Sequence, residues 1–98
     1  MSSQPTSGDQ FTSVIAAGSV VVSDKSASLK RVLISGTYVG TVSFYDSATI
    51  AGTTDATLMY TAVLPGLNLN KSIDVFARGR TGIVYAAVGT PILTFTWD

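Results

Sequence analysis

From Phe11 onward the sequence alternates between short β-favouring runs and small groups of Gly, Pro, Asn, Asp and Ser. The runs recur at spacings of roughly 8 to 14 residues, which is typical of an all-β sandwich or barrel. No segment carries apolar residues at helical spacing. The sequence therefore predicts a single antiparallel β-sandwich of about eight short strands. The expected strands are Phe11 to Ala16, Ser19 to Ser23, Leu29 to Ser35, Thr41 to Tyr45, Thr57 to Leu64, Ser72 to Ala77, Ile83 to Ala87 and Ile92 to Trp97.

Several of these runs alternate apolar and polar residues, which assigns one face to the core because strand side chains point to opposite sides in turn. The expected core residues are Val42, Phe44, Ile73, Val75, Ala77, Leu93, Phe95 and Trp97. On the same rule Phe76 points outward, and Thr94 and Thr96 occupy a solvated face.

Two runs break the alternation. Leu29 to Ser35 and Ile83 to Val88 are apolar on both sides for part of their length, so the second face needs cover from a loop, a neighbour or a partner. Charged residues make up only 12% of the chain and balance to a net charge of zero. A surface with so little charge favours association, and we expect a homo-oligomer, a trimer being one option.

The chain has 98 residues, which is one domain on any length prior. We expect a flexible N-terminal arm over residues 1–10, polar and without periodicity, and a β-sandwich domain over 11–98. The arm either has no role or becomes ordered on a neighbouring subunit. The N-terminus lacks the features of a secretory signal and no apolar run reaches membrane-spanning length, so we expect a protein made in the cytoplasm with no membrane partner.

Catalysis is disfavoured by the residue types that are missing. The chain has no His, no Cys and, since all its acids are Asp, no Glu, which removes the usual nucleophiles, bases and zinc ligands. We expect no enzyme, no catalytic residue, no cofactor and no metal site. Asp46 and Asp74 are better explained as strand or turn residues than as a carboxylate pair, and the loop from Asp46 to Asp55 lacks a calcium-binding pattern.

Basic and aromatic residues give two weaker candidates. Arg78-Gly-Arg-Thr-Gly82 is expected to be a hairpin turn, since no Walker pattern or following helix accompanies it. With Lys30 and Arg31 it supplies the local basic clusters, too few for nucleic-acid binding. Tyr45, Phe76 and Tyr38 are the aromatic residues expected to face outward, where a sugar-binding platform is conceivable, although core or interface packing is favoured for aromatics in general.

Three stretches carry a resemblance to a known family. Leu33-Ile-Ser-Gly-Thr37, Gly40-Thr-Val-Ser-Phe-Tyr-Asp-Ser-Ala-Thr49 and the run from Gly82 to Trp97 with its Gly-Thr-Pro turn resemble the small β-sandwich virion proteins of tailed bacteriophages. The resemblance covers residues 29–98 and brings no catalytic residues with it. It implies a jelly-roll-like capsid decoration or cement protein, located on the virion surface, whose partner is the major capsid protein.

Two other functions remain open. The same features suit a tail, fibre or adaptor subunit of the particle. A carbohydrate-binding β-sandwich module using Tyr45 or Phe76 is the alternative from a different class.

Overall fold

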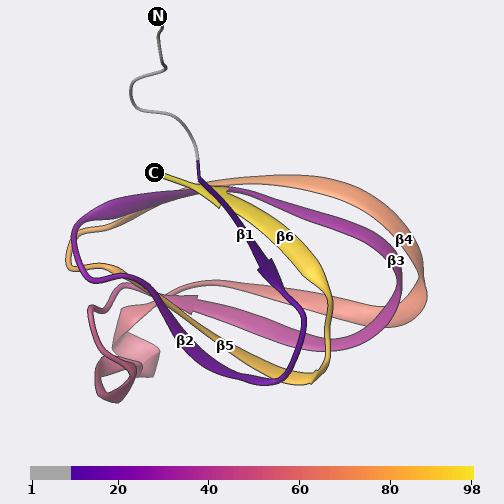
Figure 1. The fold of residues 1–98 in the computed structure, drawn as a ribbon, viewed down its shortest axis with the longest axis horizontal. Coiled ribbons are helices and arrows are strands. Elements are labelled where there is room, and N and C mark those ends of the chain that lie inside the picture. Colours follow the sequence, from indigo (N-terminus) through magenta and orange to yellow (C-terminus); the bar gives the residue numbers. More distant parts are fainter. Residues whose placement is uncertain (1–9) are drawn as a thin grey trace, which may run out of the picture.

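The computed structural model describes residues 10–98, which form a curled antiparallel sheet (Figure 1). The predicted arm lies outside the described residues except for Gln10, which begins the first strand. The elements are β1 (Gln10–Val14), β2 (Gly18–Ser23), β3 (Ala27–Tyr45), the 3-10 helices η1 (Ile50–Gly52) and η2 (Asp55–Thr57), β4 (Leu58–Gly79), β5 (Ile83–Thr90) and β6 (Leu93–Trp97). The predicted all-β class is confirmed.

The sheet has six strands, not eight. Predicted strands Leu29 to Ser35 and Thr41 to Tyr45 are parts of β3, and Thr57 to Leu64 and Ser72 to Ala77 are parts of β4. The sequence pattern predicts strand ends at the glycines between these runs. Instead Gly36, Gly40 and Gly66 adopt positive φ, so the paired strands bend together without breaking their ladder.

A β-bulge sharpens this bend. The β3–β4 register passes from Thr37↔Asn68 to Val39↔Pro65, so that Tyr38 lies opposite two residues of β4. Such bulges increase local twist and curvature. The result is a half-barrel made from one sheet, with the bend at the right of Figure 1.

The bend divides the sheet into two limbs, named from their places in Figure 1. The upper limb contains β1, β6, residues 27–37 of β3 and residues 68–79 of β4. The lower limb contains β2, β5, residues 39–45 of β3 and residues 58–65 of β4. β3 therefore has β4 along both halves, with β6 on its other side in the upper limb and β5 in the lower.

The hydrophobic core lies between the limbs. Phe44 and Phe95 are fully buried, and their ring centroids lie 4.9 Å apart in an edge-to-face arrangement that joins β3 of the lower limb to β6 of the upper. Tyr85 packs on Phe95 at 5.9 Å, and burial raises the pKa of its phenol. The inward prediction is confirmed for Val42, Phe44, Leu93 and Phe95 by full or near-full burial. Ile73, Val75 and Trp97 are partly buried against this core.

The two-sided run in β5 is covered by the chain itself. Val84 is fully buried, yet it faces away from its neighbours Ile83 and Tyr85 of the core cluster. Residues 47 and 48 lie against Gly82, which comes just before β5. The 3-10 helix η1 contacts β2, the strand that pairs with β5. No partner is needed to bury this position.

Candidate functional site

A row of side chains crosses the outer face of the upper limb. Phe11 of β1 pairs with Thr96 of β6, Thr96 pairs with Arg31 of β3, and Arg31 pairs with Asp74 of β4. Paired residues of neighbouring strands point to the same face of a sheet. The row therefore collects an aromatic ring, a hydroxyl, a guanidinium and a carboxylate from four strands.

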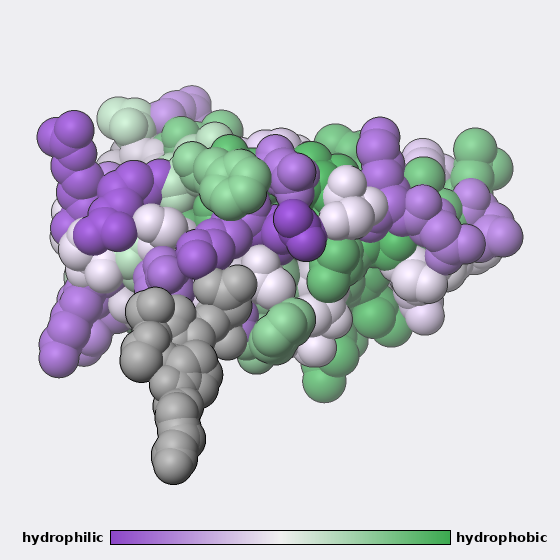
Figure 2. All heavy atoms as spheres, turned by 90° about the horizontal axis from the view of Figure 1, so that it is seen from above, coloured by the Kyte–Doolittle hydropathy of each residue, from purple (hydrophilic) through white to green (hydrophobic). Residues whose placement is uncertain are grey.

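Three members of this row line a pocket of about 270 Å³: Phe11, and Thr96 and Arg31, which form its polar floor. Its lining residues are Phe11, Lys30, Arg31, Leu33, Phe76 and Thr96. Leu33 belongs to the other two-sided run, so in the described residues its second face opens onto this pocket. Figure 2 looks onto the face of the upper limb, where hydrophobic and hydrophilic side chains lie next to one another.

The two aromatic rings are exposed, whereas Thr96 in the floor between them is buried. Phe11 is 69% exposed and Phe76 is 66% exposed, but Thr96 is only 7% exposed. The prediction of a solvated Thr96 is wrong because the surrounding long side chains shield it. Apolar rings beside a few fixed polar groups are the usual composition of a small-molecule site.

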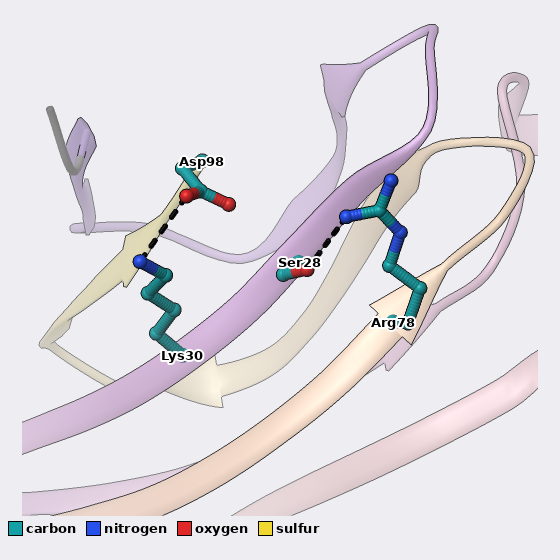
Figure 3. Close-up of polar contacts among 4 residues, drawn as sticks. All are labelled: Ser28, Lys30, Arg78 and Asp98. Atoms are coloured by element: carbon teal, nitrogen blue, oxygen red, sulfur yellow. Dashed lines mark hydrogen bonds and ion pairs between the residues drawn. The ribbon is translucent and has the colours of Figure 1, made fainter. Parts of the chain in front are cut away.

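The charges at this face are paired within the chain. Arg31 Nε donates to Asp74 Oδ1 at 2.7 Å, and Lys30 Nζ lies 3.1 Å from Asp98 Oδ2. Arg78 donates to the hydroxyl of Ser28 at 3.0 Å, and Figure 3 shows this contact beside the Lys30–Asp98 pair. Of the basic residues noted in the sequence, Lys30, Arg31 and Arg78 are therefore engaged in contacts between different parts of the sheet.

The backbone of Phe76 is strained. Its φ is +50°, the one positive φ among the described residues other than glycine, and for a bulky side chain this is a rare conformation. The strain sits in a register shift, because Leu29↔Ala77 is followed by Arg31↔Asp74 and two β4 residues oppose Lys30. Bulges of this kind redirect side chains and are frequent next to functional sites.

The positive φ of Phe76 should reverse the usual order of stability of alanine and glycine variants at this position. Gly is ordinarily less stable than Ala in a strand, but at positive φ it avoids the clash of Cβ with the backbone. We expect Phe76→Gly to be more stable than Phe76→Ala by about 1 kcal/mol in urea unfolding.

The control is Val63, which is also on β4 and is 63% exposed without positive φ. There, Val63→Ala should be more stable than Val63→Gly by about 0.5–1 kcal/mol. The same order at both positions would contradict the strained conformation of Phe76.

The predicted aromatic platform is not formed. Tyr45 is half-buried in the lower limb, whereas Phe76 lies in the upper limb. Tyr38 packs against the core, so its outward prediction is wrong, and the bulge at this residue is what upsets the alternation. Phe11, which was missed as an outward residue, is three positions from buried Val14. An odd spacing places two strand residues on opposite faces, and this signal was present in the sequence.

The acidic candidates have structural roles. Asp46 Oδ1 accepts a hydrogen bond from the Thr81 backbone N–H at 2.8 Å, which ties the end of β3 to the β4–β5 turn. The loop after it is stabilised locally, for example by Thr57 Oγ1 donating to the Gly52 carbonyl at 3.0 Å. Within residues 10–98 no group of three acidic side chains comes together as metal ligands would.

No helix in the described part of the chain is long and apolar enough to cross a membrane. Comparison of the chain with protein-family models, with curated proteins and with solved structures gave no match.

Proposed function

We propose that this protein is a bacteriophage capsid decoration, or cement, protein. It binds the outside of the assembled shell and stabilises it by contacts with the major capsid protein, after being made in the host cytoplasm. The resemblance of residues 29–98 to phage virion proteins supports this role. The structural observation that carries it is an exposed, uncharged apolar surface at the bend.

This bend surface consists of Val39, Val63, Leu67 and Val88. The register places Val63 and Val88 on either side of Thr41, on neighbouring strands, and the two side chains are 63% and 66% exposed. Val39 follows on the same face of β3 and is also exposed. Exposed apolar clusters of this kind typically mark sites of protein contact.

A contact surface without charge suits a protein that binds a lattice. Each contact is modest, but many copies on an ordered shell give high avidity. Because the protein binds the assembled shell and not free subunits, its binding energy stabilises the assembly by linkage. The proposal needs no catalytic group, in keeping with the absence of His, Cys and Glu from the chain.

We also propose that the curled sheet is a jelly-roll-like sandwich in which β3 and β4 each serve as two strands. The support is the pairing pattern. Counted this way, the upper limb has the order β1, β6, first half of β3, second half of β4, and the lower limb has β2, β5, second half of β3, first half of β4. Consecutive strands then alternate between limbs except across residues 46–57, where the second half of β3 and the first half of β4 both lie in the lower limb, as a rolled hairpin requires.

Copies of the chain are proposed to act together, as a homo-oligomer such as a trimer. The support lies in β4, which pairs only with β3 among the described residues and so leaves its other edge open over 22 residues. An open edge of this length is a template for pairing with another chain.

The proposed function is tested by quantitative mass spectrometry of purified virions. We expect the ratio of this chain to the major shell protein to lie within a few-fold of unity, because a decoration protein occupies sites repeated over the whole lattice. A ratio of about one hundredth would assign it to a tail, fibre or adaptor instead, and its absence from particles would overturn any virion role.

A pair of variants tests the bend surface in the same assay. Particles that lack the protein are mixed with purified Val63→Asp, which places a charge in the apolar surface, and with Ser72→Asp, which places one on exposed upper-limb residue Ser72. Val63→Asp should lose occupancy and Ser72→Asp should retain it. Equal occupancy would exclude the bend surface as the contact.

A further inference from the structure

We propose that the pocket on the outer face of the upper limb binds a neutral oligosaccharide. This inference goes beyond the capsid role and does not depend on it. It rests on four features of the pocket: two exposed aromatic rings, lining cations that are paired within the chain, a redirected aromatic side chain and a span wider than one sugar ring.

The aromatic rings supply the apolar contacts that a sugar needs. One face of a pyranose ring is made of C–H groups, and it packs on the face or edge of an aromatic ring much as another apolar group would. Phe11 and Phe76 are both about two-thirds exposed, at 69% and 66%, and both line the pocket. Their rings are available to a ligand without any rearrangement of the core.

The polar floor fits a ligand that has hydroxyl groups and no charge. Sugar hydroxyls both donate and accept, and the floor offers the Arg31 guanidinium as a donor and the Thr96 hydroxyl as both donor and acceptor. Arg31 and Asp74 hold each other at 2.7 Å, and Lys30 is paired with Asp98 at 3.1 Å. The cations are thus neutralised within the chain, so a phosphate or sulfate would gain little from them.

The span of the pocket indicates more than one sugar unit. Phe11 is on β1 and Phe76 is on β4, with β6 and β3 between them. Three strand spacings separate the two strands by about 14 Å, which exceeds one pyranose ring. A volume of about 270 Å³ leaves part of such a ligand in solvent. We therefore infer a disaccharide or trisaccharide as the binding unit.

The strained backbone of Phe76 does not contribute to the stability of the fold. A glycine at this position would remove the strain of φ +50° without loss of a buried contact, since Phe76 is mostly exposed. Retention of a strained aromatic residue on the surface is expected where its ring has a ligand. Phe76→Gly is accordingly the variant that removes the ring and relieves the backbone at once.

The test is an amide-shift NMR titration of the full chain with a panel of glycans. The panel holds neutral hexose and N-acetylhexosamine monosaccharides and their disaccharides and trisaccharides, sulfated counterparts, and inorganic phosphate. We expect at least one neutral disaccharide or trisaccharide to shift the amides of residues 11, 31, 33, 76 and 96 with a Kd below about 10 mM. The Kd should change little between about 50 and 500 mM salt.

Variants separate this pocket from other surfaces. Phe76→Gly and Phe11→Ala should each weaken binding about tenfold or more. Leu67→Ala removes a similarly exposed apolar side chain from the bend surface and should leave the Kd unchanged.

Three results would each overturn the proposal. They are no shift with any neutral glycan up to about 10 mM, binding confined to sulfated glycans or phosphate, and full affinity in both Phe variants. All measurements use the isolated protein. A negative glycan titration therefore does not contradict the proposed capsid role, and absence of the protein from virions does not contradict the proposed glycan site.

Discussion

Phe44→Ala is expected to bring the domain close to global unfolding. Phe44 is fully buried and its ring contacts those of Tyr60, Tyr85 and Phe95, at centroid distances of 6.5, 6.5 and 4.9 Å. Truncation of a buried Phe costs about 3–5 kcal/mol through lost transfer energy and the cavity left behind. A domain of this size has a total stability of roughly 5–15 kcal/mol. The loss is measured as a change in the free energy of urea unfolding, and the melting temperature should fall by more than about 10 °C.

The control for Phe44→Ala is Phe11→Ala, which removes the same atoms from a side chain that is 69% exposed. We expect it to cost less than about 1 kcal/mol. Similar losses in the two variants would mean that the limbs are not closed over Phe44. The comparison therefore tests the placement of the core between the limbs.

Gly40→Ala is expected to destabilise the domain by more than about 2 kcal/mol for two separate reasons. Gly40 has φ +138°, which residues with a Cβ rarely adopt. A Cβ there would also run into the backbone carbonyl oxygen of Val88 on β5 and lie 3.0 Å from the ring of Pro91. The Val88 carbonyl belongs to the ladder beside β3, so it cannot move aside without loss of pairing.

Gly18→Ala separates these two reasons. Gly18 has a similar φ of +130°, but a Cβ there would have no atom within 4 Å. It carries the conformational cost alone, so the difference between the two variants in urea unfolding isolates the close approach of β3 and β5. We expect Gly40→Ala to be the more damaging by at least about 1 kcal/mol. Equal effects would contradict the contact at the bend.

Sequence reasoning located most strand segments but did not predict that two pairs of them are continuous in β3 and in β4. The runs at Ser19 to Ser23, Ile83 to Ala87 and Ile92 to Trp97 coincide within a few residues with β2, β5 and β6. Glycine at positive φ serves a turn and a bend equally, so the sequence pattern predicts strand ends at glycines that lie inside β3 and β4. Only the pairing of β3 with β4 distinguishes a bend from a turn, and the sequence of a single strand does not show this pairing.

The candidate site was less accessible to sequence reasoning. The outward direction of Phe76 followed from alternation, and that of Phe11 could have followed from the odd spacing to Val14. The contact of Arg31 with Asp74 joins residues 43 positions apart, and Thr96 lies between Phe11 and Arg31 only because two separate ladders place it there. This grouping of side chains depends on the order of the strands in the sheet. The alternation of residues within one strand does not predict that order.

The pairing of β1 with β6 has a practical consequence for joining this protein to others. Gln10 pairs with Trp97, and the backbone of Asp98 exchanges hydrogen bonds with Ser28 in the next strand. Both ends of the described chain thus leave the domain at one place, away from the bend (Figure 1). A peptide or reporter domain joined directly before Gln10 or after Asp98 would leave the domain at that place, and two different cargoes could be carried side by side there, away from the bend surface.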